Sequence, residues 1–411
     1  MTLLPKNGAP QVIRHFTYAS NVFYPSDRTN LLSAAQQVLF QAFSDYLPLL
    51  KNRTTVVPLS GGYDSRLIAC VLKELGVSDV VCYTYGSADS KEVQISKEVS
   101  TKLGFKWIYV PYSKELFQEV LSAGLFLDYL RHAHNYSALP HVQDLFATYY
   151  LKKHALVPEN AIFVPGHTGD FYSGGHILPG LTLERQFDLR DAAELIYLYH
   201  FYLDVHTRKS AIVKKLQEQL ENEAGNLHTL VEDWDLKNRQ AKYIVNSLRV
   251  YEFFGYSHAI PLWHRKIANF FKYVSVEFKN VYTPEGLRKN LYVNTVREIF
   301  RRHDVDFEKD FTKKFKRLKL FEKSTRGLGR AVVKPLKDWL KENLPESIQS
   351  VALYLHRTVR KPFNDREHNF NELATLLNLE FYYRRSGILG SLVHVLLDLI
   401  KKENWRIFSD E

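Results

Sequence analysis

Apolar and polar residues alternate between residues 55 and 111 in a way that predicts a β-α-β-α-β unit. Three short apolar runs are expected to be strands, at residues 55–59, 80–85 and 107–110. The first helix is expected to begin after Gly62 and end at Gly76, and the second to span residues 91–103. Strands and helices alternating at these lengths predict the α/β class, with a parallel sheet covered by helices on both faces.

Outside this unit the apolar spacing is mainly helical. A helix is expected at residues 30–47, residues 113–155 are expected to be mostly helical, and residues 187–280 all helical. An apolar helix at 387–401 is too short to span a bilayer. The predicted organisation is an N-terminal extension at 1–50, an α/β domain at 51–280 and a basic, mainly helical C-terminal region at 281–411.

Composition narrows the class of protein. With 411 residues and 45% hydrophobic content the chain can bury a substantial core. Cys70 and Cys82, the only two cysteines, fall in apolar segments, so neither a disulfide framework nor a zinc site is expected. We expect a cytoplasmic protein, since the sequence shows no signal peptide and no apolar run of about 18 residues. The net charge of +10 favours anionic ligands, but an excess of surface lysine explains it equally well, and no specific nucleic acid is predicted.

The segment between the first strand and its helix is the strongest candidate site. Gly61 and Gly62 let backbone N–H groups approach an anion, and the helix dipole that follows favours negative charge. Ser60 and Ser65 add hydroxyl donors. Asp64 would repel a phosphate directly, so we expect it to hold a Mg²⁺ that bridges to one. The alternative is an ordinary strand-to-helix turn with a capping side chain.

A second glycine-rich turn follows another expected strand, at residues 161–164. It contains four glycines and Asp170. Glycines after a strand indicate close approach of the backbone to a ligand. The carboxylates of Asp64 and Asp170, together with a pyrophosphate, form a ligand set that suits Mg²⁺. His167 and His176 in this turn are either hydrogen-bonding residues of a pocket or ligands of a transition metal.

Both turns resemble motifs of one family. Residues 60–65 resemble the pyrophosphate loop of the N-type ATP pyrophosphatases (the PP-loop superfamily), which have the adenine nucleotide α-hydrolase-like fold. Leu59 and Arg66, on either side of the loop, resemble the asparagine synthetase and β-lactam synthetase branch. The second turn resembles that branch's second Mg²⁺-binding stretch, with four residues in register: Gly166, Asp170, Gly174 and Gly175.

The resemblance implies roles for individual residues. ATP and Mg²⁺ are the implied cofactors, and Asp64 and Asp170 are the implied metal ligands. The implied nucleotide contacts are Leu59, Ser60, Gly61, Gly62, Asp64, Ser65, Thr84, Tyr85, Gly86, Gly166 and His167. Lys313 or Lys314 would neutralise charge on the transferring phosphoryl group, so they join the two aspartates as candidate catalytic residues.

Several positions depart from the family pattern or leave two interpretations open. His167 and Phe171 stand where the family has glutamates, and Ser257, Ala259 and His264 stand where it has Glu, Arg and Asp. The acceptor pocket is therefore expected to differ. Glu92 and Asp144 are each either site residues or ordinary acids at a helix start. Four polar residues recur on one helix face that points either at the nucleotide or at water: Arg239, Lys242, Asn246 and Arg249.

The function implied by the resemblance is an ATP-dependent, AMP-forming amide ligase. It would adenylate a small-molecule carboxylate and transfer ammonia or an amine to it, and a sugar uronate of surface polysaccharide synthesis is the suggested substrate. Residue 2 is Thr2, not the nucleophilic cysteine of the family's glutaminase domain, so nitrogen is expected from free ammonia, an amine or a separate glutaminase subunit. The alternatives are another PP-loop adenylating enzyme, or a nucleotide-binding protein without catalytic activity.

Overall fold

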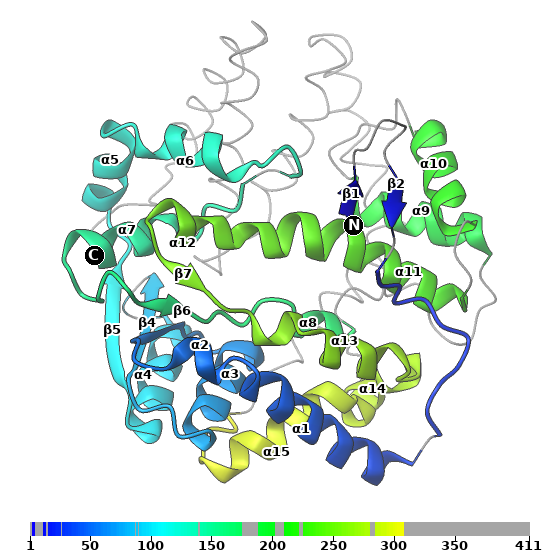
Figure 1. Cartoon of the computed structure of the whole chain (residues 1–411), viewed down its shortest axis with the longest axis horizontal. Coiled ribbons are helices and arrows are strands. Elements are labelled where there is room, and N and C mark those ends of the chain that lie inside the picture. Colours follow the sequence, from blue (N-terminus) through cyan, green and yellow to red (C-terminus); the bar gives the residue numbers. More distant parts are fainter. Residues whose placement is uncertain are drawn as a thin grey trace, which may run out of the picture.

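Five short parallel strands form the centre of the fold (Figure 1). They are β3 (Thr55–Pro58), β4 (Val80–Gly86), β5 (Lys106–Pro111), β6 (Ile162–Phe163) and β7 (Ser257–His258). Their spatial order is β5-β4-β3-β6-β7. The chain thus builds outward from β3 to one edge and then returns to build the other edge from β6. This order places a topological switch point between β3 and β6, where α/β sheets bind their ligands.

The computed structural model describes residues 2–4, 11–13, 15–25, 27–86, 88, 90–138, 140–174, 188–201, 209–221, 225–279 and 284–307. The helices before the second glycine turn are α1 (Arg28–Ser44), α2 (Leu47–Leu50), α3 (Tyr63–Glu74), α4 (Lys91–Leu103), α5 (Lys114–Ser122), α6 (Leu125–Ala133) and α7 (Leu145–Lys153). The helices after it are α8 (Gly169–Tyr172), α9 (Leu189–His200), α10 (Lys209–Glu221), α11 (Leu227–Asp235), α12 (Arg249–Phe253), α13 (Arg265–Lys272), α14 (Pro284–Lys289) and α15 (Leu291–Arg302).

Successive strand residues point to opposite faces of the sheet and supply two separate cores. Val57 and Cys82 belong to the core that includes residues of α1, α3, α4, α13 and α15. Val56 and Val81 belong to the core on the other face, with residues of α5, α6, α7 and α12. Figure 1 shows these two groups of helices on opposite sides of the sheet. The predicted α/β class, with a parallel sheet and helices on both faces, is confirmed.

A long helical segment crosses the molecule (Figure 1). Its first helix, α11, forms most of a third apolar cluster together with α9 and α10. The segment continues from α11 through a π-helical stretch, η1 (Leu236–Ile244), and a 3-10 stretch, η2 (Val245–Leu248), into α12. Two further 3-10 turns are η3 (Pro261–Trp263) and η4 (Val276–Phe278). Wide helical turns of the π type often occur beside functional sites.

One expectation about secondary structure was wrong. Residues 187–280 are not all helical, because β7 lies within them and extends the sheet. The N-terminal segment also contains two short strands, β1 (Thr2–Leu4) and β2 (Gln11–Ile13), which pair as an antiparallel ribbon. The expected apolar helix at 387–401 lies outside the described residues.

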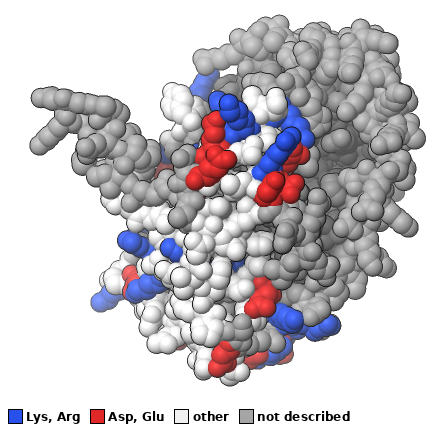
Figure 2. Space-filling view, turned by 90° about the vertical axis from the view of Figure 1, so that its right-hand side faces the viewer, with Lys and Arg blue, Asp and Glu red and all other residues white. Residues whose placement is uncertain are grey.

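Described basic side chains are accompanied by acidic ones on one face of the molecule, where Figure 2 shows the two charges intermixed. Glu194 of α9 pairs with Arg190 of the same helix and with Lys209 of α10, each with an N–O distance of 3.4 Å. In the part of the chain that the structure describes, no helix has the length and apolar character needed to cross a membrane.

Candidate active site

The loop after β3 is held by its own side chains. Ser65 Oγ accepts the Ser60 backbone N–H at 3.0 Å, and Ser60 Oγ accepts the Gly62 N–H at 3.1 Å. The two serine hydroxyl oxygens lie 3.0 Å apart. Leu59 continues the strand direction by donating its N–H to the Tyr83 carbonyl at 2.8 Å. The loop therefore keeps its shape at the N-terminus of α3, a 12-residue helix, through local hydrogen bonds.

An anionic group already lies on this loop. The Gly61 N–H donates to the Glu92 carboxylate, with a distance of 3.0 Å from N to Oε2. Glu92 is in the first turn of α4, after β4. A phosphate oxygen makes the same kind of contact with a backbone N–H, so the geometry suits anion binding at Gly61.

The two glycine-rich motifs lie against one another. A Cβ on Gly169 would fall 2.3 Å from Cγ of Asp64, and a Cβ on Gly166 would fall 2.8 Å from Cβ of Asp64. Glycine at both positions is thus required for this approach. Asp170, the next residue along, is exposed on α8. The carboxylate-bearing turns after β3 and β6 meet at the switch point, although they are far apart in the sequence.

This pair of acids fits a Mg²⁺ ion. Within the described residues there is no group of three or more His, Cys, Asp or Glu side chains arranged to hold a metal. Mg²⁺ needs no such cage, because it is usually bound by one or two carboxylates together with water and substrate phosphates. The exposed carboxylate of Asp170 leaves room for those other ligands.

Tyr292 is a residue at this site that sequence reasoning missed. Its hydroxyl donates to Asp64 Oδ1 at 2.7 Å, although the two residues are 228 positions apart. Burial, with the nearby Asp64 carboxylate as the next cause, raises the pKa of Tyr292 well above its usual value, so the phenol keeps its proton. The Asp170 carboxylate adds to this effect, which shows that it too lies near the tyrosine. No motif marks Tyr292, because only the fold brings α15 here.

Thr84, Tyr85 and Gly86, which are among the expected nucleotide contacts, lie at the end of β4, next to the loop. The Thr84 hydroxyl donates to the Leu59 carbonyl oxygen at 2.6 Å, so this side chain supports the loop. Gly86 has a φ of +121°, a conformation that favours glycine, and its carbonyl accepts the Tyr109 hydroxyl at 2.7 Å. Tyr85 stacks on Tyr112 with ring centroids 4.7 Å apart.

Three uncharged histidines, His141, His167 and His258, lie near one another. His167 Nε2 is 2.7 Å from Ser247 Oγ in η2. Since the Ser247 proton goes to the Ile244 carbonyl at 2.6 Å, the imidazole is the donor in this contact. Burial, with repulsion from His141 and His258, lowers the pKa of His167 to about 3. His167 is therefore neutral, which suits a hydrogen-bonding residue.

Asp144 and Phe171 lie in buried positions near these histidines and the glycine turn. The Asp144 side chain does not cap α7. Burial raises the pKa of this carboxyl group, while His141 and a hydrogen bond from Tyr85 oppose the shift. Phe171 is fully buried and packs edge-on against Tyr18, with ring centroids 5.0 Å apart. Where the family pattern has a glutamate, this chain has a core residue.

Other candidate positions contact protein groups away from the loop. Asn246 Nδ2 donates to the Ala133 carbonyl at 2.7 Å, and Arg249 Nε donates to the His132 carbonyl at 3.0 Å. That part of the helix face thus packs on α6. His264 pairs with Asp45 at 3.2 Å and caps α13. Four residues singled out in the sequence lie outside the described residues: Gly175, His176, Lys313 and Lys314.

Comparisons with known proteins identify one family by sequence. No protein of curated function matches the sequence. Among solved structures, NMN synthetase from Francisella tularensis is 16% identical, with a TM-score of 0.26, over 68% of this chain and 97% of that one. The U34-tRNA thiolase NcsA from Methanococcus maripaludis is 13% identical, with a TM-score of 0.24, over 68% and 81%. These two likenesses are too weak to support an argument about function.

The sequence itself gives a clear match. The model of the family described as asparagine synthase covers residues 49–385, which include both glycine-rich motifs and α15. Because the match extends over most of the 411 residues, this chain belongs to the asparagine synthase family.

Proposed function

We propose that the protein is an ATP-dependent, AMP-forming ligase that converts a substrate carboxylate to an amide. Family membership supports an ATP-using enzyme that forms carbon–nitrogen bonds. The observation that carries the proposal is the meeting of the two motifs at the switch point. There Asp64 packs on Gly169, next to Asp170 and beside a loop whose Gly61 N–H contacts an anionic group.

In the proposed reaction the backbone and the serine hydroxyls of residues 59–62 and 65 hold the β- and γ-phosphates of ATP. Asp64 and Asp170 would hold Mg²⁺, which supplies positive charge to the pyrophosphate leaving group. A carboxylate oxygen of the acceptor attacks the α-phosphorus, and the bond to pyrophosphate breaks. Ammonia or an amine then attacks the acyl carbon, AMP leaves, and the nitrogen loses a proton. We propose Thr84, Tyr85, Gly86, Gly166 and His167 as further nucleotide contacts, and Lys313 or Lys314 as the source of positive charge at the phosphoryl group.

The substrate we propose is a carboxylate without a cationic amino group, such as a sugar uronate. Two observations support this choice: His167 is neutral, and Phe171 is buried in the core. Neither residue offers the negative charge that glutamates at these positions would present to an ammonium group. A neutral imidazole that donates through Nε2 keeps Nδ1 as an acceptor, which suits a sugar hydroxyl.

The two alternative functions, sulfur transfer and nucleotide binding without catalysis, require different features of the chain. Sulfur transfer would use a reactive cysteine, but burial raises the pKa of Cys70 and Cys82 to about 12 each, so neither is a thiolate at neutral pH. A nucleotide-binding protein without activity would still bind Mg²⁺–ATP, but it would not form AMP and pyrophosphate.

The test is exchange of labelled pyrophosphate into ATP, which reports reversible adenylation. We expect exchange only when Mg²⁺ and one class of carboxylate are both present, and we expect Asp64→Asn to abolish it. If exchange occurs but no uronate or amino acid stimulates it, the result would argue against a carboxylate acceptor. Full exchange by the Asp64→Asn variant would show that Asp64 does not hold the metal.

A further inference from the structure

We propose that Tyr292 is a positioning residue for the metal ligand Asp64, and that α15 holds the two carboxylate-bearing turns in register. This inference rests on the proposed function, because it assigns Asp64 to the Mg²⁺ site. It concerns a part of the chain well beyond the loop motifs, where the sequence carries no signal for the site.

Helix α15 packs against α3, the helix that carries Asp64. The rings of Tyr63 and Phe300 stack with centroids 5.9 Å apart and planes within 6°. The Arg66 guanidinium lies over the Phe300 ring at 4.5 Å and donates to the Val305 carbonyl at 2.8 Å. Arg66 is almost fully buried. The residues on either side of Asp64 are therefore fixed to α15 and the turn after it.

Helix α15 is also tied to α8, the helix that carries Asp170. Asn290 caps α15 by accepting the Val293 N–H at 2.9 Å, and its amide donates to the Ser173 carbonyl at 2.8 Å. Asn290 is fully buried. One side chain thus begins α15 and ties it to the end of α8.

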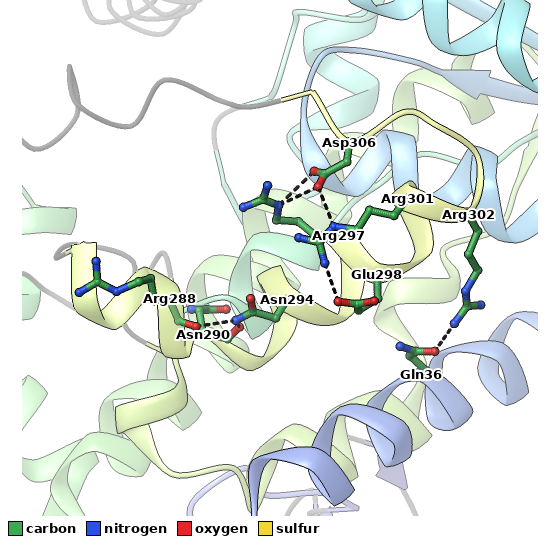
Figure 3. Close-up of polar contacts among 9 residues, drawn as sticks. All are labelled: Gln36, Arg288, Asn290, Asn294, Arg297, Glu298, Arg301, Arg302 and Asp306. Carbon is green, nitrogen blue, oxygen red and sulfur yellow. Dashed lines mark hydrogen bonds and ion pairs between the residues drawn. The ribbon is translucent and has the colours of Figure 1, made fainter.

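Further polar contacts fix α15 itself (Figure 3). Arg297 and Arg301 both pair with Asp306, at 3.0 and 3.3 Å, so the segment after the helix folds back onto it. Arg302 reaches Gln36 of α1. The helix is thereby held from its first residues to its last, and Tyr292 projects from a rigid element.

The hydroxyl of Tyr292 orients the Asp64 carboxylate. It donates to Oδ1, which restrains the orientation of the carboxylate. Tyr172 provides a matched comparison. It is fully buried beside Tyr292, with centroids 6.3 Å apart, but its hydroxyl has no hydrogen-bond partner among the described residues. Residues that orient a metal ligand usually contribute 10–100-fold, roughly, to metal affinity.

The test measures how much Mn²⁺ improves binding of an ATP analogue whose α,β-bridging oxygen is a methylene. Calorimetry gives the Kd with and without Mn²⁺ for the full-length wild type, Tyr292→Phe and Tyr172→Phe, and thermal unfolding reports whether each is folded. We expect Tyr292→Phe to weaken binding with Mn²⁺ by about tenfold and to leave metal-free binding unchanged. Tyr172→Phe should match the wild type in both measurements.

Three results would overturn the proposal. Wild-type metal dependence in Tyr292→Phe would show that the hydroxyl does not position Asp64. Equal losses in both tyrosine variants would show a general packing effect. If the wild type itself gains nothing from Mn²⁺, the metal site and the proposed function fail together, which the wild-type measurement alone reveals.

Discussion

Glu92 occupies a position on the loop that the pyrophosphate is proposed to take. Its carboxylate accepts the Gly61 N–H at 3.0 Å, and a Cβ on Gly61 would lie 3.5 Å from Cδ of Glu92. Two anions cannot share one N–H group without strong repulsion. Glu92 therefore has to move away when a nucleotide binds.

We predict that Glu92→Gln binds Mg²⁺–ATP more tightly than the wild type. Removing one charge about 4 Å from the phosphates is worth at least about 1 kcal/mol, or roughly fivefold in Kd. Glu98→Gln, on the exposed side of the same helix, is the control for the loss of one negative charge. Weaker binding by Glu92→Gln alone would instead indicate that Glu92 helps to hold the cation.

We also predict that His167 makes stability depend on pH. Its pKa is about 3 in the folded protein and about 6.5 in an unfolded chain, so between these values the unfolded state binds the extra proton. The contribution is fully present above pH 6.5 and is lost as pH falls toward 3. The free energy of unfolding should fall by up to about 1.4 kcal/mol per pH unit more in the wild type than in His167→Asn. Urea unfolding at pH 7 and 5.5 measures this, and parallel losses would contradict it.

Single residues were predictable where they belong to a contiguous motif. The glycines and serines of the loop act locally, so their spacing in the sequence predicts the turn. Tyr292 and Ser247 act on residues far away in the sequence, and neither position carries a local signal. Asp144 illustrates a third case: its place at a helix start suggested a cap, but burial beside Tyr85 gives it another environment.

At the scale of elements, α3 and α8 matter most for the site because they bring the two acids together. We predict that Gly169→Ala both destabilises the protein and abolishes metal-dependent nucleotide binding. The added methyl group would fall 2.3 Å from the Asp64 carboxylate and 2.4 Å from the Tyr292 hydroxyl. Overpacking of this kind costs typically about 1–3 kcal/mol. Urea unfolding and analogue binding with Mn²⁺ check both parts, and a variant like the wild type in both would contradict the observed contact.

Helices and strands could be predicted where their apolar residues recur with a clear period. The helix expected at residues 91–103 is α4 with the same ends, and the three expected strands of the first unit are β3, β4 and β5. By contrast, β7 consists of Ser257 and His258 only and has no apolar run, so nothing in the sequence distinguishes it from a loop. The strand order also could not be predicted, since it depends on which edge each crossover returns to.

At the scale of the whole molecule, a buried ion pair and a neighbouring tyrosine join three segments that lie apart in the sequence. Lys279 Nζ lies 2.8 Å from Glu232 Oε1, and both side chains are almost fully buried. Lys279 also approaches the Tyr18 hydroxyl at 3.4 Å. The pair links α11 and η4 to the segment after β2.

We predict that Lys279→Met destabilises the protein by about 3–5 kcal/mol, because it leaves the Glu232 carboxylate buried without its cation. The double variant Lys279→Met/Glu232→Gln should recover much of that loss, since it removes both charges. Urea unfolding of the two variants tests this. Equal destabilisation of both would mean that shape, not charge, determines the stability at this position.

The central claim is that this molecule splits ATP into AMP and pyrophosphate in order to make an amide. Phosphorus NMR of ATP and Mg²⁺ with the protein, ammonia and a panel of sugar acids and amino acids tests it most directly. We predict that AMP and pyrophosphate appear in equal amounts with one class of carboxylate and not without it. Formation of ADP and phosphate, or no turnover with any acid despite measurable ATP binding, would contradict the account.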